Sequence, residues 1–186
     1  FAWYPPGLLT AWLTALALGG MAVALLLLGG PEGLESALRD VVGHALDRIA
    51  EPGLAGRDQI VGALATVIPG IVAASWMTMA ILNGTLAQGL LDRFGLSWRP
   101  APDLVALALP WWIPLLLGAA AAATVVGGTA RFVGINLMIA LCVPLVLAGL
   151  AVLHAATRRL SHPAAALILF YTLAGLFGWP LLAVAI

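Results

Sequence analysis

Five long apolar stretches, each free of Asp, Glu, Lys and Arg, dominate this sequence. They cover approximately residues 8–28, 60–82, 110–130, 132–154 and 163–186. A helix needs about 20 mostly apolar residues to span the roughly 30 Å hydrocarbon core of a bilayer. Hydrophobic residues make up 63% of the 186-residue chain and charged residues only 9%, which is more apolar surface than a soluble domain of this size can bury. The sequence therefore predicts an all-α, polytopic transmembrane helix bundle with about five spans.

Residues 32–50, between the first two spans, have the pattern of an amphipathic helix. Glu35 and Arg39 form a favourable pair four residues apart. Residues 30–58 carry three arginines against six acidic residues, which does not suit an anchor for anionic lipids. We expect this helix to pack on the ends of the bundle rather than to lie on the membrane surface. The apolar residues share one face at helical spacing: Leu34, Leu38, Val41, Val42, Ala45 and Ile49.

The third span has an irregular start, in the stretch "PAPDLVALALPWWIP". Proline is favoured at the first helical position, and tryptophan is favoured where a helix meets the membrane surface. Taking Pro110 as the first helical residue satisfies both preferences, because Trp111 and Trp112 then lie at the interface. We expect residues 103–109 to form a short interfacial or re-entrant helix.

The domain organisation is simple. No internal repeat and no low-complexity linker divides the chain, which predicts a single membrane domain over residues 1–186. The chain starts at Phe1 rather than at a methionine and stops inside "LLAVAI". This predicts that it is part of a longer protein.

Signatures of enzyme chemistry are missing from the sequence. It contains no HExxH, GxSxG, P-loop, GxGxxG or CxxC motif. The histidines, His44, His154 and His162, are scattered, and no two of them have the spacing of metal ligands. The single cysteine, Cys142, lies in an apolar run, where cysteine usually acts as a small hydrophobic residue. We expect neither an enzyme nor a metal or cofactor site. Without a basic patch, nucleic acid is not an expected partner.

Four polar side chains at or near membrane depth are candidates for binding a ligand or for hydrogen bonds between helices: Asn83, Gln88, Arg131 and Asn136. A polar group in the bilayer is costly unless it is paired, so such residues mark helix contacts or solute sites. For Asn136 a hydrogen bond between helices is favoured over a ligand. For Arg131, in the tight connection between two spans, a side chain that snorkels to water is favoured over a ligand clamp.

The stretch "MAILNGTLAQGLLDRFG" separates two kinds of polar residue on one helix. Thr78, Thr85 and Asp92 recur every seven residues with Gln88 beside them, which indicates a polar stripe leaving the bilayer. Asn83 lies on the opposite, apolar face. It needs a partner, which is another helix, a backbone carbonyl freed by a nearby proline, or a ligand.

The segments "NGTLAQGLLDRFG", "PAPDLVALALPWWIP", "INLMIALCVPLVLAGLAVLH" and "FYTLAGL" resemble the YybS-like family of bacterial multi-pass membrane proteins. That family is a domain of unknown function, distantly similar to the substrate-binding membrane subunits of energy-coupling-factor vitamin transporters. The resemblance covers about residues 60–186, most specifically Asn83 to Pro114. It implies a helical bundle in the bacterial cytoplasmic (inner) membrane and supplies no substrate. None of the transporter subunits' substrate-binding residues can be placed on this sequence.

Small-solute transport or solute binding by a membrane subunit is the first function that these features favour. Transport folds use interrupted helices to line a site, and prolines interrupt or begin the spans at Pro69, Pro110, Pro114 and Pro144. Without a nucleotide-binding motif, such a chain would act with partner membrane subunits in the lipid bilayer. The alternative is a structural or assembly subunit of a larger membrane complex, which the many small-residue faces suit. A membrane enzyme ranks last.

Overall fold

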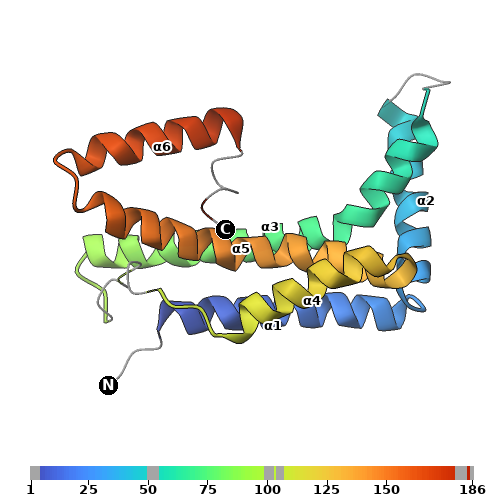
Figure 1. Cartoon of the computed structure of the whole chain (residues 1–186), viewed down its shortest axis with the longest axis horizontal. Coiled ribbons are helices and arrows are strands. Elements are labelled where there is room, and N and C mark those ends of the chain that lie inside the picture. The colour runs from blue at the N-terminus through green and yellow to red at the C-terminus, as the bar shows by residue number, and fades with distance from the viewer. Residues whose placement is uncertain (1–4, 50–54, 99–102, 104–106, 179–183, 185–186) are drawn as a thin grey trace. The chain divides into compact units, whose positions relative to one another are not determined.

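A computed structural model of the chain describes residues 5–49, 55–98, 103, 107–178 and 184 (Figure 1). These residues contain helices and no strand, which confirms the predicted all-α membrane bundle. The helices α1, α3 and α5 are long and apolar enough to cross a membrane, and α4 and α6 are shorter apolar helices. The helices are α1 (Pro6–Leu27), α2 (Pro31–Ile49), α3 (Arg57–Arg93), α4 (Trp112–Val126), α5 (Gly128–Thr157) and α6 (Pro163–Phe177).

The helix α3 is much longer than the span predicted over residues 60–82. It has 37 residues, which corresponds to about 55 Å at 1.5 Å per residue. The polar stripe that follows the span remains helical as far as Arg93, and Gly95 then ends the helix with a φ of 66°. The residues with which the chain leaves the membrane, called the polar exit below, are therefore part of the same helix.

The region around α4 departs from the prediction. Its first helical residue is Trp112 rather than Pro110, and the helix ends at Val126 rather than near residue 130. Gly127, with a φ of 91°, separates α4 from α5 because this backbone conformation suits only glycine. The expected short helix over 103–109 is not present at residues 103 and 107–109, and residues 104–106 lie outside the described part. The last predicted span, 163–186, is helical as far as Phe177, and most of its remainder also lies outside the described part.

The chain divides into two compact units. Unit 1 comprises Phe1–Thr14, Met77–Ile113 and Cys142–Ile186. Unit 2 comprises Ala15–Trp76 and Pro114–Leu141. A single membrane domain over residues 1–186 stays a prediction.

Unit 2 is packed through glycines that allow helices to approach closely. A Cβ atom at Gly134 of α5 would lie 2.6 Å from the carbonyl oxygen of Ala120 on α4. A Cβ atom at Gly70 of α3 would lie 2.9 Å from the carbonyl oxygen of Asn136 on α5. Real Cβ atoms do not come this close to backbone atoms, so both contacts require glycine. Such contacts are the usual way in which membrane helices pack.

The helix α2 has the amphipathic pattern that the sequence predicts, and one end of its apolar face is covered. Leu34 and Val42 are buried, whereas Val41 and Ile49 are 66% and 83% exposed. The predicted pair of Glu35 and Arg39 is present, with 2.7 Å between its charged atoms.

A second ion pair joins α2 to the beginning of α3, beside which α2 runs (Figure 1). The Arg57 guanidinium lies 2.7 Å from the Asp47 carboxylate and also donates to the Gly43 carbonyl at 3.3 Å. Arg57 and Asp47 are partly exposed. This connection joins the last turns of α2 to the first turn of α3, close to the exposed Ile49.

We expect Asp47→Asn to lower the free energy of unfolding only slightly, because exposed ion pairs contribute little. Chemical unfolding in detergent at low and at high salt would measure this. Salt should reduce the difference from the wild type, since it screens the pair. A larger, salt-independent loss would show that Asp47 has a structural role beyond its charge.

Candidate functional site

The polar centre of unit 2 is the side chain of Asn136, which is fully buried on α5. Its Oδ1 accepts a hydrogen bond of 2.6 Å from the backbone N–H of Gly70 on α3. Its Nδ2 donates to the carbonyl oxygen of Thr66 on α3 at 2.8 Å, and to that of Phe132 on its own helix at 2.8 Å. One amide group therefore contacts α3 at both a donor and an acceptor.

These two α3 groups are partners in a regular helix, where the N–H of residue 70 bonds to the carbonyl of residue 66. Pro69 precedes Gly70 inside α3. A proline in this position has no N–H, and its ring clashes with the carbonyl four residues earlier, which opens the helix. Asparagine offers a donor and an acceptor on one planar group. The Asn136 amide therefore bridges the turn of α3 that contains Pro69.

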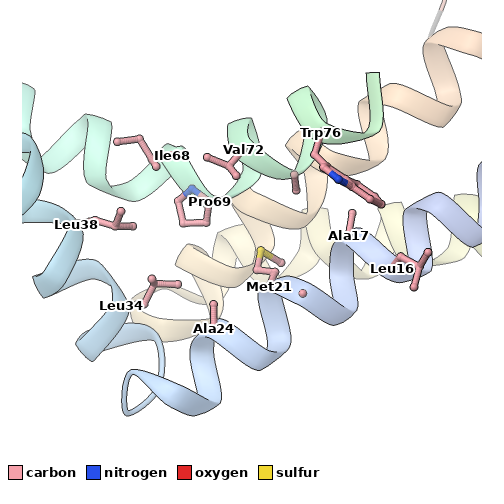
Figure 2. A pocket seen from close by; sticks show the side chains of 12 residues that line it. Leu16, Ala17, Met21, Ala24, Leu34, Leu38, Ile68, Pro69, Val72 and Trp76 are labelled. Carbon is pink, nitrogen blue, oxygen red and sulfur yellow. The ribbon is translucent and has the colours of Figure 1, made fainter. Parts of the chain in front are cut away.

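A partly open apolar pocket of about 490 Å³, called the cavity below, lies in the same unit and includes Pro69 in its wall. Figure 2 shows that its side chains come from α1, α2 and α3. The size falls within the roughly 300–1,000 Å³ of small-molecule sites in proteins. The lining residues are Leu16, Ala17, Gly20, Met21, Ala24, Leu34, Leu38, Ile68, Pro69, Val72, Ala73 and Trp76.

The model of a family described as "Predicted membrane protein (DUF2232)" matches residues 55–186. The chain belongs to this family. The match includes α3 to α6, and therefore both Asn136 and the break at Pro69, whereas α1 and α2 precede it. No curated protein and no solved structure matches the chain. The family match and the long apolar helices together identify the chain as a membrane protein.

The four sequence candidates are divided between the two units. Asn136 and Arg131 belong to unit 2, and Asn83 and Gln88 belong to unit 1. Arg131 is exposed in the first turn of α5. Gln88 donates hydrogen bonds to Asp92 at 3.1 Å and to Ser97 at 2.8 Å, so it lies within the polar exit of α3.

The structure shows no hydrogen-bond partner for Asn83 among the described residues. Its side chain is exposed, and it forms no hydrogen bond with any residue that the structure describes. The partners expected for Asn83, a second helix and a backbone interrupted by proline, are instead the partners of Asn136.

Polar residues at the end of α5 lie in unit 1. Nδ1 of His154 is 2.8 Å from the carbonyl oxygen of Leu150, and its ring lies 6.0 Å from that of Tyr171. Arg158 lies 3.8 Å from the Asp103 carboxylate. Within the described ranges, no three His, Cys, Asp or Glu side chains are placed to bind a metal together.

Sequence reasoning did not identify Thr66 and Gly70 as partners of Asn136, nor the residues of the cavity. The Pro69–Gly70 pair inside an uncharged run was the available signal, since such a pair weakens a helix and exposes its backbone groups. The cavity had no comparable signal, because its lining consists of ordinary apolar residues from three helices.

Proposed function

We propose that this protein is a solute-binding membrane subunit that holds a small molecule in the cavity between α1, α2 and α3. The observation that carries the proposal is the position of this cavity beside Pro69, the proline inside α3 where the Asn136 amide binds the helix backbone. Membrane transport proteins commonly build their sites at interrupted helices near the middle of the bilayer. Unit 2 has this arrangement, and the Asn136 amide holds it together.

The proposed subunit works with a partner in a bacterial cytoplasmic membrane, which the chain crosses several times. The chain has no nucleotide-binding motif of its own, so a partner supplies the energy for transport. The resemblance to YybS-like proteins, and through them to energy-coupling-factor subunits, supports this division of labour. The proposal assigns the chain no catalytic step and no nucleic-acid partner.

An alternative is a structural subunit of a larger membrane complex. It is favoured by a row of exposed apolar side chains on the second part of α3, where Leu82, Leu86 and Leu90 are 56%, 70% and 59% exposed. These residues are four apart and share one face of the helix. A partner helix could cover this face, as lipid could.

Gentle purification from the native membrane, followed by mass spectrometry of proteins and small molecules, tests the two functions. The binding function predicts a stoichiometric partner with an ATPase and a retained small molecule. A large stable complex that contains no ATPase and retains no small molecule would favour the structural subunit and reject the binding function.

A further inference from the structure

The cavity wall contains almost no polar atoms. Its lining residues have no ionisable side chain, and the heteroatoms of their side chains are the sulfur of Met21 and the indole N–H of Trp76 (Figure 2). A charged ligand would leave its water shell here without gaining a partner, which is strongly unfavourable. Sites for charged solutes instead contain a few precisely placed polar groups.

The turn of α3 at Pro69 does not offer the cavity the polar groups that an interrupted helix usually offers to a ligand. In many transporters the freed backbone N–H and carbonyl groups at such a break coordinate the substrate or an ion. Here the Gly70 N–H and the Thr66 carbonyl are bonded to the Asn136 amide of α5. Ala65, whose carbonyl loses its helical donor at Pro69, does not line the cavity. Ile68 and Pro69 of this turn line it, and both side chains are apolar.

The cations at the contact of α2 with α3 are also engaged. Arg39 is paired with Glu35, and its guanidinium lies over Gly62 of α3. Arg57 is paired with Asp47 and Asp58. Their carboxylate partners offset the positive charge that could otherwise attract an anionic group to this end of the unit.

We infer that the ligand of this cavity is an uncharged, mainly hydrocarbon molecule. The inference rests on the proposed binding function and specifies its ligand class. A volume of about 490 Å³ suits a compact ring system or a section of a hydrocarbon chain. The Gly70 N–H and the Thr66 carbonyl beside Pro69 are hydrogen-bonded to the Asn136 amide of α5. These backbone groups therefore do not bind an ion or an anionic ligand in the cavity.

Photolabelling with adamantane diazirine, a compact uncharged probe, tests the inference in phosphatidylcholine vesicles that contain the whole chain. We expect label on the lining residues, and we expect Gly20→Leu to reduce it at least about fivefold by filling the cavity. Gly20 lines the cavity, and a Cβ atom there would meet no atom within 4 Å. Gly19→Leu is the matched control, because Gly19 has the same free space and does not line the cavity. Equal labelling in the two variants would overturn the inference.

Competition distinguishes an apolar site from a polar one. Adamantane methanol should displace the probe, and adamantane carboxylate of the same shape should be at least about tenfold weaker, because its charge has no partner in the cavity. A carboxylate that competes as well as the alcohol would overturn the assignment of an uncharged ligand.

Extraction of the molecules bound to the purified native protein identifies the source of the ligand. The molecules bound to the wild type are compared with those bound to Gly20→Leu. An uncharged small solute lost in the variant supports the inference and the proposed function together. A membrane lipid lost in the variant supports the inference and rejects the solute-binding function. A charged solute lost in the variant overturns the inference and leaves the proposed function standing.

Discussion

Replacement of Asn136 by leucine is expected to lower the free energy of unfolding by about 2–4 kcal/mol, because a buried backbone group without a partner costs about 1–3 kcal/mol. The Gly70 N–H and the Thr66 carbonyl both lose their side-chain partner in this variant. The interrupted helix cannot easily restore a regular turn, since Pro69 remains in place. Thermal or chemical unfolding of the purified protein in detergent would measure the loss.

Asn83→Leu is the control for this experiment. It makes the same chemical change on α3, but Asn83 is exposed and has no hydrogen bond with the described residues. We expect a change within about 0.5 kcal/mol, as for other exposed positions. Equal losses in the two asparagine variants would contradict the bridging role of Asn136.

A double-mutant cycle separates the bridge from general packing. In Pro69→Ala the residue at position 69 regains its N–H, so α3 can close its own turn and needs the Asn136 amide less. The loss caused by Asn136→Leu should then be smaller by about 1 kcal/mol or more, as for residues in one hydrogen-bond network. An unchanged loss in the two backgrounds would show that the amide does not compensate for the proline.

The apolar pattern of the sequence was sufficient to predict the helices, because membrane spans require long uncharged runs. The Glu35–Arg39 pair followed from spacing within one helix. The predicted end of α4 near residue 130 was wrong, because Gly127, with a φ of 91°, separates α4 from α5 before the apolar run is finished. Local sequence does not show which of several small residues will end a helix.

The candidate site was less predictable for a physical reason. Asn83 and Asn136 are the same residue type in similar apolar surroundings, and sequence alone indicates that each needs a partner. The partner of Asn136 lies 66 residues away in the chain, at the Gly70 N–H. Pairing over this distance depends on which faces of α3 and α5 are in contact. The close contact at Gly70 determines these faces, and the asparagine itself does not. The cavity likewise exists only when three helices are in place.

Gly70→Leu is expected to have a still larger effect, because it separates α3 from α5. Even the Cβ atom of the new side chain would lie 2.9 Å from the Asn136 carbonyl oxygen, 2.9 Å from Cβ of Ile139 and 3.0 Å from Cα of Asn136. Two of these atoms belong to the backbone of α5 and cannot rotate away. Overpacking usually costs about 1–3 kcal/mol, and here the displacement also breaks the Asn136 bridge, so we expect a loss above about 3 kcal/mol or failure to fold.

Gly70→Ala keeps this prediction measurable, with an expected loss of about 1–3 kcal/mol by detergent unfolding. Gly84→Ala is the matched control on the same helix, since a Cβ atom there would meet no atom within 4 Å. In an ordinary helix this control would be neutral or slightly stabilising. Because Pro69 lines the cavity next to Gly70, the Gly70→Ala displacement should also weaken labelling by the apolar probe, although Gly70 itself does not line the cavity. A stable Gly70→Ala protein with unchanged labelling would mean that α3 and α5 do not pack through this glycine, and that the Asn136 bridge does not position the cavity wall.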